Sequence, residues 1–336
     1  MARILLFGSG SIGTAYAFIL CRAGAEVVCV CRSNYEAVKC NGFRIESTVF
    51  GNHAFKPIVV RSVTEAVGLK EEAFDYIVIC TKSYPGENST VASKISPAMS
   101  SHATNIVLIQ NGLGIENEFK TYFPSSPIIS GVAYMPTTQV SPGFVVHTEL
   151  ERLHLGMFPA SNSLTDKTLL EKFANLINKG GATAILHEDV QVQRWKKIIA
   201  NGTWNPVCAL SRCRDVEFLQ SSAFASEFIK NAMSEVCMLA ESLGYADEIN
   251  AESIEWQMSR TRARPWPGVE PSMMADMRKG RGMEVEAVIG YMIKMAKENS
   301  IAVPRLETLY VLLAGLDFYF RMEEQKSSDQ KLGMLL

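Results

Sequence analysis

One short glycine-rich segment restricts the fold of this chain more than any other feature. The segment, in order, is Gly8, Ser9, Gly10, Ser11, Ile12 and Gly13. It directly follows an apolar run over residues 4–7, opens a predicted helix through residues 15–22, and precedes a second apolar run over residues 27–31. A G-x-G-x-x-G in this strand, turn and helix context is typical of a dinucleotide-binding turn. The alternative is a tight turn that binds no ligand.

Each glycine of this turn has a separate expected role. The first, Gly8, permits the tight turn, and the second, Gly10, lets the backbone approach a pyrophosphate. The third, Gly13, allows the helix to pack closely on the strand. Backbone N–H groups at the start of the helix would then meet the phosphate charge. We therefore predict that residues 8–13 bind the cofactor.

The first half of the chain continues to alternate strand-like and helix-like segments. Further apolar runs rich in β-branched residues stand at 76–80 and 106–109. Such runs without polar alternation are typical of strands buried on both faces, so the pattern predicts a parallel α/β sheet. Between about 128 and 158 strand pairs surround the turn at residues 141–143, which we interpret as an antiparallel extension of that sheet.

After about residue 188 the strand patterns stop and helical patterns take over. They cover roughly residues 189–210, 222–243, 247–262, 282–298 and 304–322. The predicted fold is therefore a Rossmann-type dinucleotide-binding domain followed by an all-α domain. We expect the first domain to span 1–188, the helical substrate and catalytic domain to span 189–325, and a polar tail to occupy 326–336.

Composition excludes several classes of function. Lys and Arg number 33 against 35 for Asp and Glu, so the basic excess expected of a nucleic-acid-binding protein is lacking. No apolar run approaches the ~20 residues of a membrane span. The eight cysteines form no C-x-x-C and the five histidines show no metal spacing, so we expect no metal. Buried reduced thiols and an N-terminus that enters a strand at once indicate a cytoplasmic protein.

The residue at the end of the second strand indicates which dinucleotide binds. NAD sites usually place Asp or Glu there to bond the ribose 2′-hydroxyl, whereas this chain has Arg32. A carboxylate would repel a 2′-phosphate, and a guanidinium can bond one bidentately. Arg32 therefore favours NADP(H), the alternative being a solvated arginine at a strand end.

Two further polar residues follow later strands of the predicted sheet. Lys82 comes after the run at 76–80, and Asn111 comes after the run at 106–109. Ligands of open α/β folds bind at the carboxyl ends of the strands. These two residues are therefore candidates for contact with the ligand, although each alone would be an ordinary loop residue.

A narrow polar stripe marks the first helix of the second half. Lys197, Asn201 and Asn205 stand at i, i+4 and i+8, which places them on one helix face among apolar neighbours. Buried polar groups need partners, and a small polar substrate would supply them. The alternative is a hydrogen-bond network between domains. Because no histidine is evident in this half of the chain, the acid–base role falls to Lys197.

Taken together, these motifs resemble the ketopantoate reductase family, over about residues 3–320. The glycine turn is similar to the family's NADP loop, and Lys197-x-x-x-Asn201-x-x-x-Asn205 is similar to its catalytic helix. The segment that runs from Ser272 to residue 286 is similar to its second substrate segment.

The resemblance implies the role of each site residue. Lys197 would be the proton donor, and Asn201, Asn205 and Ser272 would hold the substrate. Asn111 and Glu284 would line the junction of nicotinamide and substrate, Glu284 as a catalytic residue as well. From spacing alone, Glu284 reads as a first-turn glutamate that stabilises the helix dipole, and Ser272 as a helix N-cap.

Two positions depart from the family pattern. Pro85 stands where members often carry an amide side chain, and Asp215 stands where a substrate-binding asparagine is often found. An anionic Asp215 would either repel the carboxylate of a 2-keto acid or point elsewhere.

The resulting prediction is an NADPH-dependent reductase of a 2-keto acid, with ketopantoate as the first candidate. The cofactor is expected across the carboxyl edge of the sheet and the substrate in a cleft between the domains. The alternatives are a reductase of another branched 2-keto acid and a protein that senses NADP without turnover. The sequence leaves the oligomeric state open, with a homodimer as one option.

Overall fold

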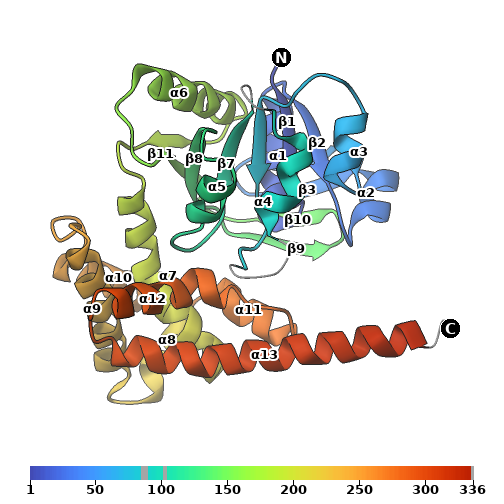
Figure 1. Cartoon of the computed structure of the whole chain (residues 1–336). Coiled ribbons are helices and arrows are strands. Elements are labelled where there is room, and N and C mark those ends of the chain that lie inside the picture. Colours follow the sequence, from blue (N-terminus) through green and yellow to red (C-terminus); the bar gives the residue numbers. More distant parts are fainter. Residues whose placement is uncertain (85–89, 101–103, 334–336) are drawn as a thin grey trace. The chain divides into compact units, whose positions relative to one another are not determined.

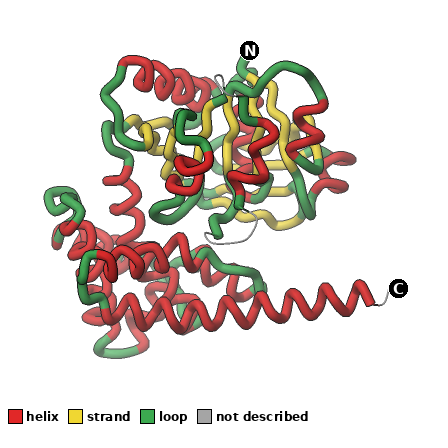
Figure 2. Tube along the Cα trace, viewed as in Figure 1, coloured by secondary structure: helices red, strands yellow, loops and turns green. Residues whose placement is uncertain are grey.

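The computed structural model of the chain describes residues 1–84, 90–100 and 104–333. They form two compact units, one made of residues 1–111 and 115–190, the other of residues 112–114 and of the chain from Gln191 onward. Strands occur in the first unit, and the regular structure described after Leu186 is helical (Figures 1 and 2). Within these described ranges no helix is both long enough and apolar enough to cross a bilayer.

The first unit is built on an eight-stranded sheet with the order β12-β11-β8-β7-β6-β1-β2-β5. Its strands are β1 (Arg3–Phe7), β2 (Glu26–Val30), β5 (Ile58–Val60), β6 (Tyr76–Ile79), β7 (Asn105–Ile109), β8 (Ile128–Tyr134), β11 (Arg152–Phe158) and β12 (Ala184–Leu186). All neighbours are parallel except β8 and β11. Every side chain of β6 is buried, as expected of a central strand covered on both faces. The predicted parallel α/β sheet is thus confirmed.

Helices cover both faces of this sheet. On one face α1 (Ser11–Arg22) contacts α6 (Leu164–Lys179). The other face carries α3 (Val63–Gly68), α4 (Val91–Ile95), α5 (Glu116–Tyr122) and a short 3₁₀ turn, Ser96–Ala98. Another short helix, α2 (Tyr35–Asn41), lies beside β5. Right-handed crossovers require this arrangement, because the chain moves along the sheet in opposite directions before and after β5.

The turn at residues 141–143 does not extend the main sheet as the sequence predicted. Its strands, β9 (Thr137–Ser141) and β10 (Phe144–His147), belong to a separate four-stranded sheet with the order β4-β3-β10-β9. Besides β9, β10 pairs with β3 (Phe43–Ser47), about 100 residues earlier, and β3 in turn pairs with β4 (Gly51–Phe55). The prediction was wrong here because the hairpin pattern shows that two strands pair with each other but not which third strand they join. An antiparallel extension does exist, but it is β11 beside β8.

The second unit is a bundle around one central helix. Its helices are α7 (Gln191–Ser211), α8 (Asp215–Ser221), α9 (Ala225–Ser242), α10 (Ala251–Arg262), α11 (Ser272–Arg278), a π-helix (Glu286–Gly290), α12 (Tyr291–Glu298) and α13 (Pro304–Gly333). α7 contacts α8, α9, α10, α11 and α13. The predicted helices are present, but the sequence missed α8 and α11, and α13 continues beyond the predicted end at residue 322.

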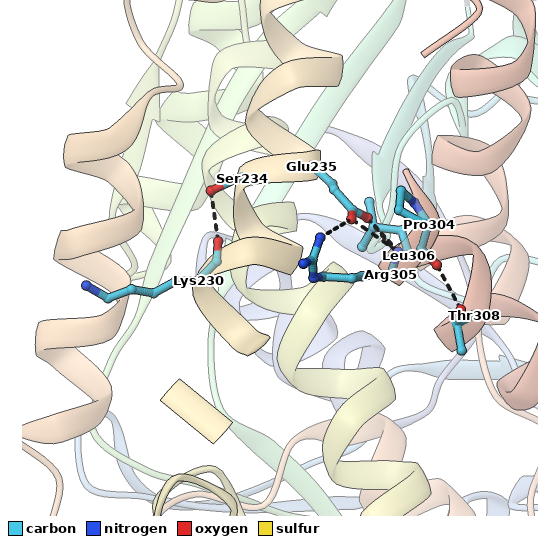
Figure 3. A network of polar contacts seen from close by, with 7 residues as sticks. All are labelled: Lys230, Ser234, Glu235, Pro304, Arg305, Leu306 and Thr308. Carbon is cyan, nitrogen blue, oxygen red and sulfur yellow. Dashed lines mark hydrogen bonds and ion pairs between the residues drawn. The ribbon is translucent and has the colours of Figure 1, made fainter. Parts of the chain in front are cut away.

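A buried carboxylate fixes the start of α13 (Figure 3). Glu235 of α9 is only 4% exposed and accepts hydrogen bonds from the backbone N–H groups of Arg305 and Leu306, at 3.0 and 2.9 Å. The guanidinium of Arg305 adds an ion pair at 3.1 Å. First-turn N–H groups have no acceptor within their own helix, and a negative charge there also favours the helix dipole. Glu235 therefore joins α9 to the beginning of α13.

Candidate active site

Four neighbouring strands of the main sheet bring sequence-predicted residues of the first unit to one edge. In the order of the strands, β2 is followed by Arg32, β1 by the glycine turn, β6 by Lys82 and β7 by Asn111. All four strands are parallel, so their carboxyl ends lie at the same edge of the sheet. A ligand along this edge would meet all four elements in succession.

The glycine turn is closed on one side and open on the other. Gly8 has φ +103°, and a Cβ there would lie 2.6 Å from the backbone nitrogen of Thr81. A Cβ on Gly13 would lie 1.9 Å from the carbonyl oxygen of Gly8. In contrast, nothing described lies within 4 Å of a Cβ placed on the exposed Gly10. The turn therefore requires its first and third glycines for packing and leaves room for a ligand beside the second.

The N-terminus of α1 is suited to bind an anion. Gly10 is the N-cap residue and provides no side chain to cap the helix. The first-turn N–H groups of Ser11 and Ile12 have no acceptor within the helix, and they lie at the positive end of its dipole. The Ser11 hydroxyl accepts a hydrogen bond from the backbone N–H of Gln139 at 2.9 Å, which ties this end of α1 to β9. The open turn and these donors fit the pyrophosphate of a dinucleotide.

Two side chains, those of Ser9 and Asn34, stabilise the glycine turn by hydrogen bonds to backbone carbonyls. The Ser9 hydroxyl donates to the carbonyl of Val30 at 3.0 Å, so its proton is already used and a phosphate would be met by the backbone N–H of Ser9 instead. The Asn34 amide donates to the carbonyl of Ser9 at 2.7 Å. Sequence reasoning did not single out Asn34, because no local pattern distinguishes a bracing asparagine from one on the surface.

The two arginines at the ends of β2 and β5 differ in their surroundings. Arg61 forms an ion pair with Glu36, and its guanidinium lies 4.2 Å from the centre of the Tyr35 ring. Arg32 is exposed, and among the described residues no carboxylate lies within ion-pair distance of it. Arg32 is therefore available to bind an anionic group at this edge.

A glutamine joins the two remaining strand ends. The Gln110 amide donates to the carbonyl of Thr81 at 2.9 Å, which connects the residue before Lys82 with the residue before Asn111. Lys82 and Asn111 are both half-buried. Gln110 was not predicted, because its function depends on the neighbouring strand rather than on its own segment.

In the second unit, α7 holds the predicted polar stripe. The helix is continuous from Gln191 to Ser211, so Lys197, Asn201 and Asn205 lie one above another on a single face. Asn205 is 5% exposed, and the other two are half-buried. The stripe therefore consists of polar groups at the margin of an apolar core, where hydrogen-bonding partners are needed.

Lys197 has an unusual proton affinity. Its pKa is lowered from 10.5 to about 8, first by burial and second by the positive charge of Arg194. The carboxylate of Glu284 acts in the opposite sense and raises the pKa. An amine with a pKa of about 8 holds a proton at neutral pH and releases it far more readily than an ordinary lysine.

Glu284 lies just before one short helix, and Ser272 is the first residue of another. Glu284 precedes the π-helix, and its carbonyl accepts the N–H of Val288 at 3.0 Å. Ser272 is the exposed first residue of α11, which contacts α7, and Pro271 occupies the N-cap position. The interpretation of Ser272 as a possible N-cap was thus wrong. Pro271, with its extended backbone, is the last residue before the helix, and Ser272 already lies within the helix.

Asp215 is held in a structural ion pair. It is 1% exposed, and its Oδ1 accepts the backbone N–H groups of Val216 and Val269, each at 2.8 Å. Its Oδ2 pairs with the guanidinium of Arg264. Asp215 therefore fastens the segment before α11 to α8, and its charge is already compensated. Pro85, the other departure from the family pattern, lies outside the described residues.

Comparison with known proteins identifies the family. The family model described as ketopantoate reductase PanE/ApbA matches residues 4–160, and the one for its C-terminal region matches residues 189–317. A 2-dehydropantoate 2-reductase of Nostoc sp. is 26% identical over 94% of this chain and 95% of its own length. An uncharacterised protein of Saccharomyces cerevisiae is 30% identical over 93% of each chain.

A solved structure agrees with these sequence matches. The crystal structure of 2-dehydropantoate 2-reductase from Methylococcus capsulatus is 31% identical, with a TM-score of 0.82 over 95% of this chain and 97% of that one. The chain belongs to the ketopantoate reductase family. It is accordingly an oxidoreductase that uses a nicotinamide dinucleotide, as the sequence predicted.

Proposed function

We propose that this member of the family reduces a 2-keto acid with NADPH, and that 2-dehydropantoate (ketopantoate) is its substrate and pantoate its product. The observation that carries the proposal is Lys197, whose pKa is lowered to about 8 and which shares a helix face with Asn201 and Asn205. A protein that only senses NADP has no use for such a proton donor. We assign cofactor binding to residues 1–188 and substrate binding and catalysis to residues 189–325.

Residues of the first unit would hold the cofactor. The turn of residues 8–13 and the first N–H groups of α1 would bind the phosphates, and Arg32 would bind the 2′-phosphate. Lys82 and Asn111 would contact the part of the cofactor that extends along β6 and β7. Once bound, the nicotinamide supplies the hydride that reduces the keto carbon.

Residues of the second unit would orient the substrate and provide the proton. Asn201, Asn205 and Ser272, together with Asn111 of the first unit, would donate and accept hydrogen bonds with the polar groups of the keto acid. Lys197 would stabilise the negative charge that develops on the keto oxygen and then protonate it. Glu284 would keep Lys197 protonated by its negative charge.

This assignment predicts a pH profile for the reaction. Below its pKa Lys197 is protonated, so the rate of keto acid reduction should fall as pH rises through about 8. Oxidation of the hydroxy acid needs the unprotonated amine and should rise over the same interval. In Glu284→Gln the charge that favours the protonated amine is lost, so the alkaline limb should move to lower pH. The measurement is kcat for NADPH oxidation between about pH 6 and 10.

The neighbouring Glu286 provides the control for this profile. Glu286 is exposed and accepts a hydrogen bond from the Tyr310 hydroxyl at 2.9 Å. Glu286→Gln should leave the alkaline limb in place. If the limb of Glu284→Gln stays at or above that of the wild type, Glu284 does not act on the proton donor.

The choice of substrate gives a second prediction. Ketopantoate carries a hydroxyl that 2-ketoisovalerate lacks, and a site built to bond a hydroxyl rejects the analogue without it by up to ~10⁴–10⁵ in kcat/KM. We expect ketopantoate to be reduced at least about tenfold better, measured by competing the two acids at equal concentration. Preference for 2-ketoisovalerate would transfer the proposal to another branched 2-keto acid. Binding of NADPH with no turnover of any acid would support the sensing alternative.

We extend the proposal to the pathway, the cellular compartment and the oligomeric state of the enzyme. Reduction of ketopantoate is a step of pantothenate biosynthesis, and we propose a cytoplasmic location for it. All eight cysteines are free thiols in the structure, as suits a reducing compartment. For the oligomeric state, we propose a homodimer.

A further inference from the structure

A three-residue loop after β7 is packed inside the helical unit. Leu113 is 3% exposed within the helical core, and its N–H donates to the carbonyl of Ala287 in the π-helix at 3.0 Å. Gly112 has φ +101°, and a Cβ there would lie 2.3 Å from that same carbonyl oxygen. A Cβ on Gly114 would lie 2.2 Å from the ring of Tyr291. The loop therefore lies so close to the π-helix and α12 that both glycines are required.

A buried arginine of α7 holds the same loop from the other side. Arg194 is 3% exposed, and its Nη1 donates to the carbonyl of Gly112 at 3.0 Å. Arg194 and Lys197 stand at i and i+3, so they are neighbours on the helix surface. Because Gly112 is bonded to Asn111, this one guanidinium connects the backbone next to Asn111 with the helix that carries Lys197.

We propose that Arg194 is a positioning residue of the reductase site: it fastens the loop that follows Asn111 to α7 and places a second positive charge beside Lys197. This inference rests on the proposed function for the roles of Asn111 and Lys197. Burying a guanidinium is costly, and a purely apolar side chain would fill the position more cheaply. The hydrogen bond to Gly112 and the charge beside the proton donor are two functions that an apolar side chain could not perform.

The charge of Arg194 has an effect on Lys197 that can be measured separately from its hydrogen bond to Gly112. Besides burial, two groups act on the pKa of Lys197: Arg194 of α7 lowers it, and Glu284, before the π-helix, raises it. Removal of the Arg194 charge should therefore raise the pKa of Lys197, whereas loss of the hydrogen bond alone should not. A merely structural arginine would affect folding but would not move this titration.

The test compares Arg194→Met, which removes charge and hydrogen bond, with Arg194→Lys, which keeps the charge but not the guanidinium geometry. The first readout is the pH midpoint of Lys197 acetylation by acetic anhydride in the cofactor-free protein, followed by mass spectrometry. The second is kcat for ketopantoate reduction by NADPH. Arg260→Met is the matched control, because Arg260 lies on α10 over the ring of Trp256 and is exposed.

Arg194→Met should raise the labelling midpoint by about one pH unit or more and lower kcat by about ten- to a hundredfold. Arg194→Lys should keep the wild-type midpoint and lower kcat, and Arg260→Met should change neither. An unchanged midpoint in Arg194→Met overturns the proposal. A wild-type kcat in Arg194→Lys overturns the proposal as well. This second variant provides the test if Arg194→Met does not fold.

Failure of the proposed function has a different signature. If the wild type reduces no 2-keto acid, the rates are uninformative, but the labelling midpoints are measured without substrate or cofactor. A shifted midpoint in Arg194→Met would then still support the proposed effect of the Arg194 charge on Lys197. An unshifted midpoint would contradict it.

Discussion

Replacing Lys197 by alanine is expected to lower kcat for keto acid reduction by ~10²–10⁴, the usual contribution of a positioned general acid. The lysine lies on the helical unit, whereas the glycine turn and Arg32 lie on the first unit, so the Kd of NADPH should change little. Stopped-flow or steady-state measurement of NADPH oxidation gives the rate, and titration of NADPH fluorescence gives the affinity.

The adjacent lysine is the control for this experiment. Lys196 is turned ~100° around the helix from Lys197 and therefore lies off the face of the polar stripe. Lys196→Ala should therefore keep most of the wild-type kcat. Equal losses in the two variants would mean that the helix-face assignment is wrong.

The second large effect concerns the choice of cofactor. Arg32→Ala should weaken the binding of NADPH and leave that of NADH nearly unchanged, because only NADPH carries the 2′-phosphate. A hydrogen bond to a charged group contributes ~1.5–3 kcal/mol, so the preference for NADPH should fall roughly 10- to 150-fold. The measurement is kcat/KM for each cofactor at fixed keto acid concentration.

Arg61 at the end of the next strand provides a matched variant. Its guanidinium is already paired with Glu36 and lies over the Tyr35 ring, so Arg61→Ala should leave the cofactor preference in place. Equal losses for NADPH and NADH in Arg32→Ala would show that Arg32 supports the fold of the turn rather than the 2′-phosphate.

Local features of the structure were predictable from the sequence because their causes are local. The glycine turn is one such feature, since Gly8 and Gly13 are required by contacts within a single strand-turn-helix unit and its neighbour. The polar stripe of α7 is another, because helical periodicity alone places Lys197 and Asn201 on one face. Residues 4–7 of β1 and the whole of β6 form runs without charged residues, which is sufficient to indicate strands covered on both sides.

The residues that sequence reasoning missed act across long separations in the chain. Gln110 and Asn34 brace segments 29 and 25 residues away, and Arg194 reaches a carbonyl 82 residues earlier. Asp215, for which the sequence left open whether it would repel a keto acid carboxylate or point elsewhere, pairs with Arg264, 49 residues later. None of these partners is visible in a window of sequence.

The sequence by itself therefore determined the class of fold, the glycine turn after the first strand and the helix that carries the candidate proton donor, because periodicity and backbone sterics act over a few residues. Tertiary structure alone decided that β9 and β10 join β3 in a second sheet, that the loop at residues 112–114 packs among the helices, and that burial, Arg194 and Glu284 set the pKa of Lys197. Strand pairing, desolvation and charge interactions depend on distances in space, and those distances exist only once the chain has folded.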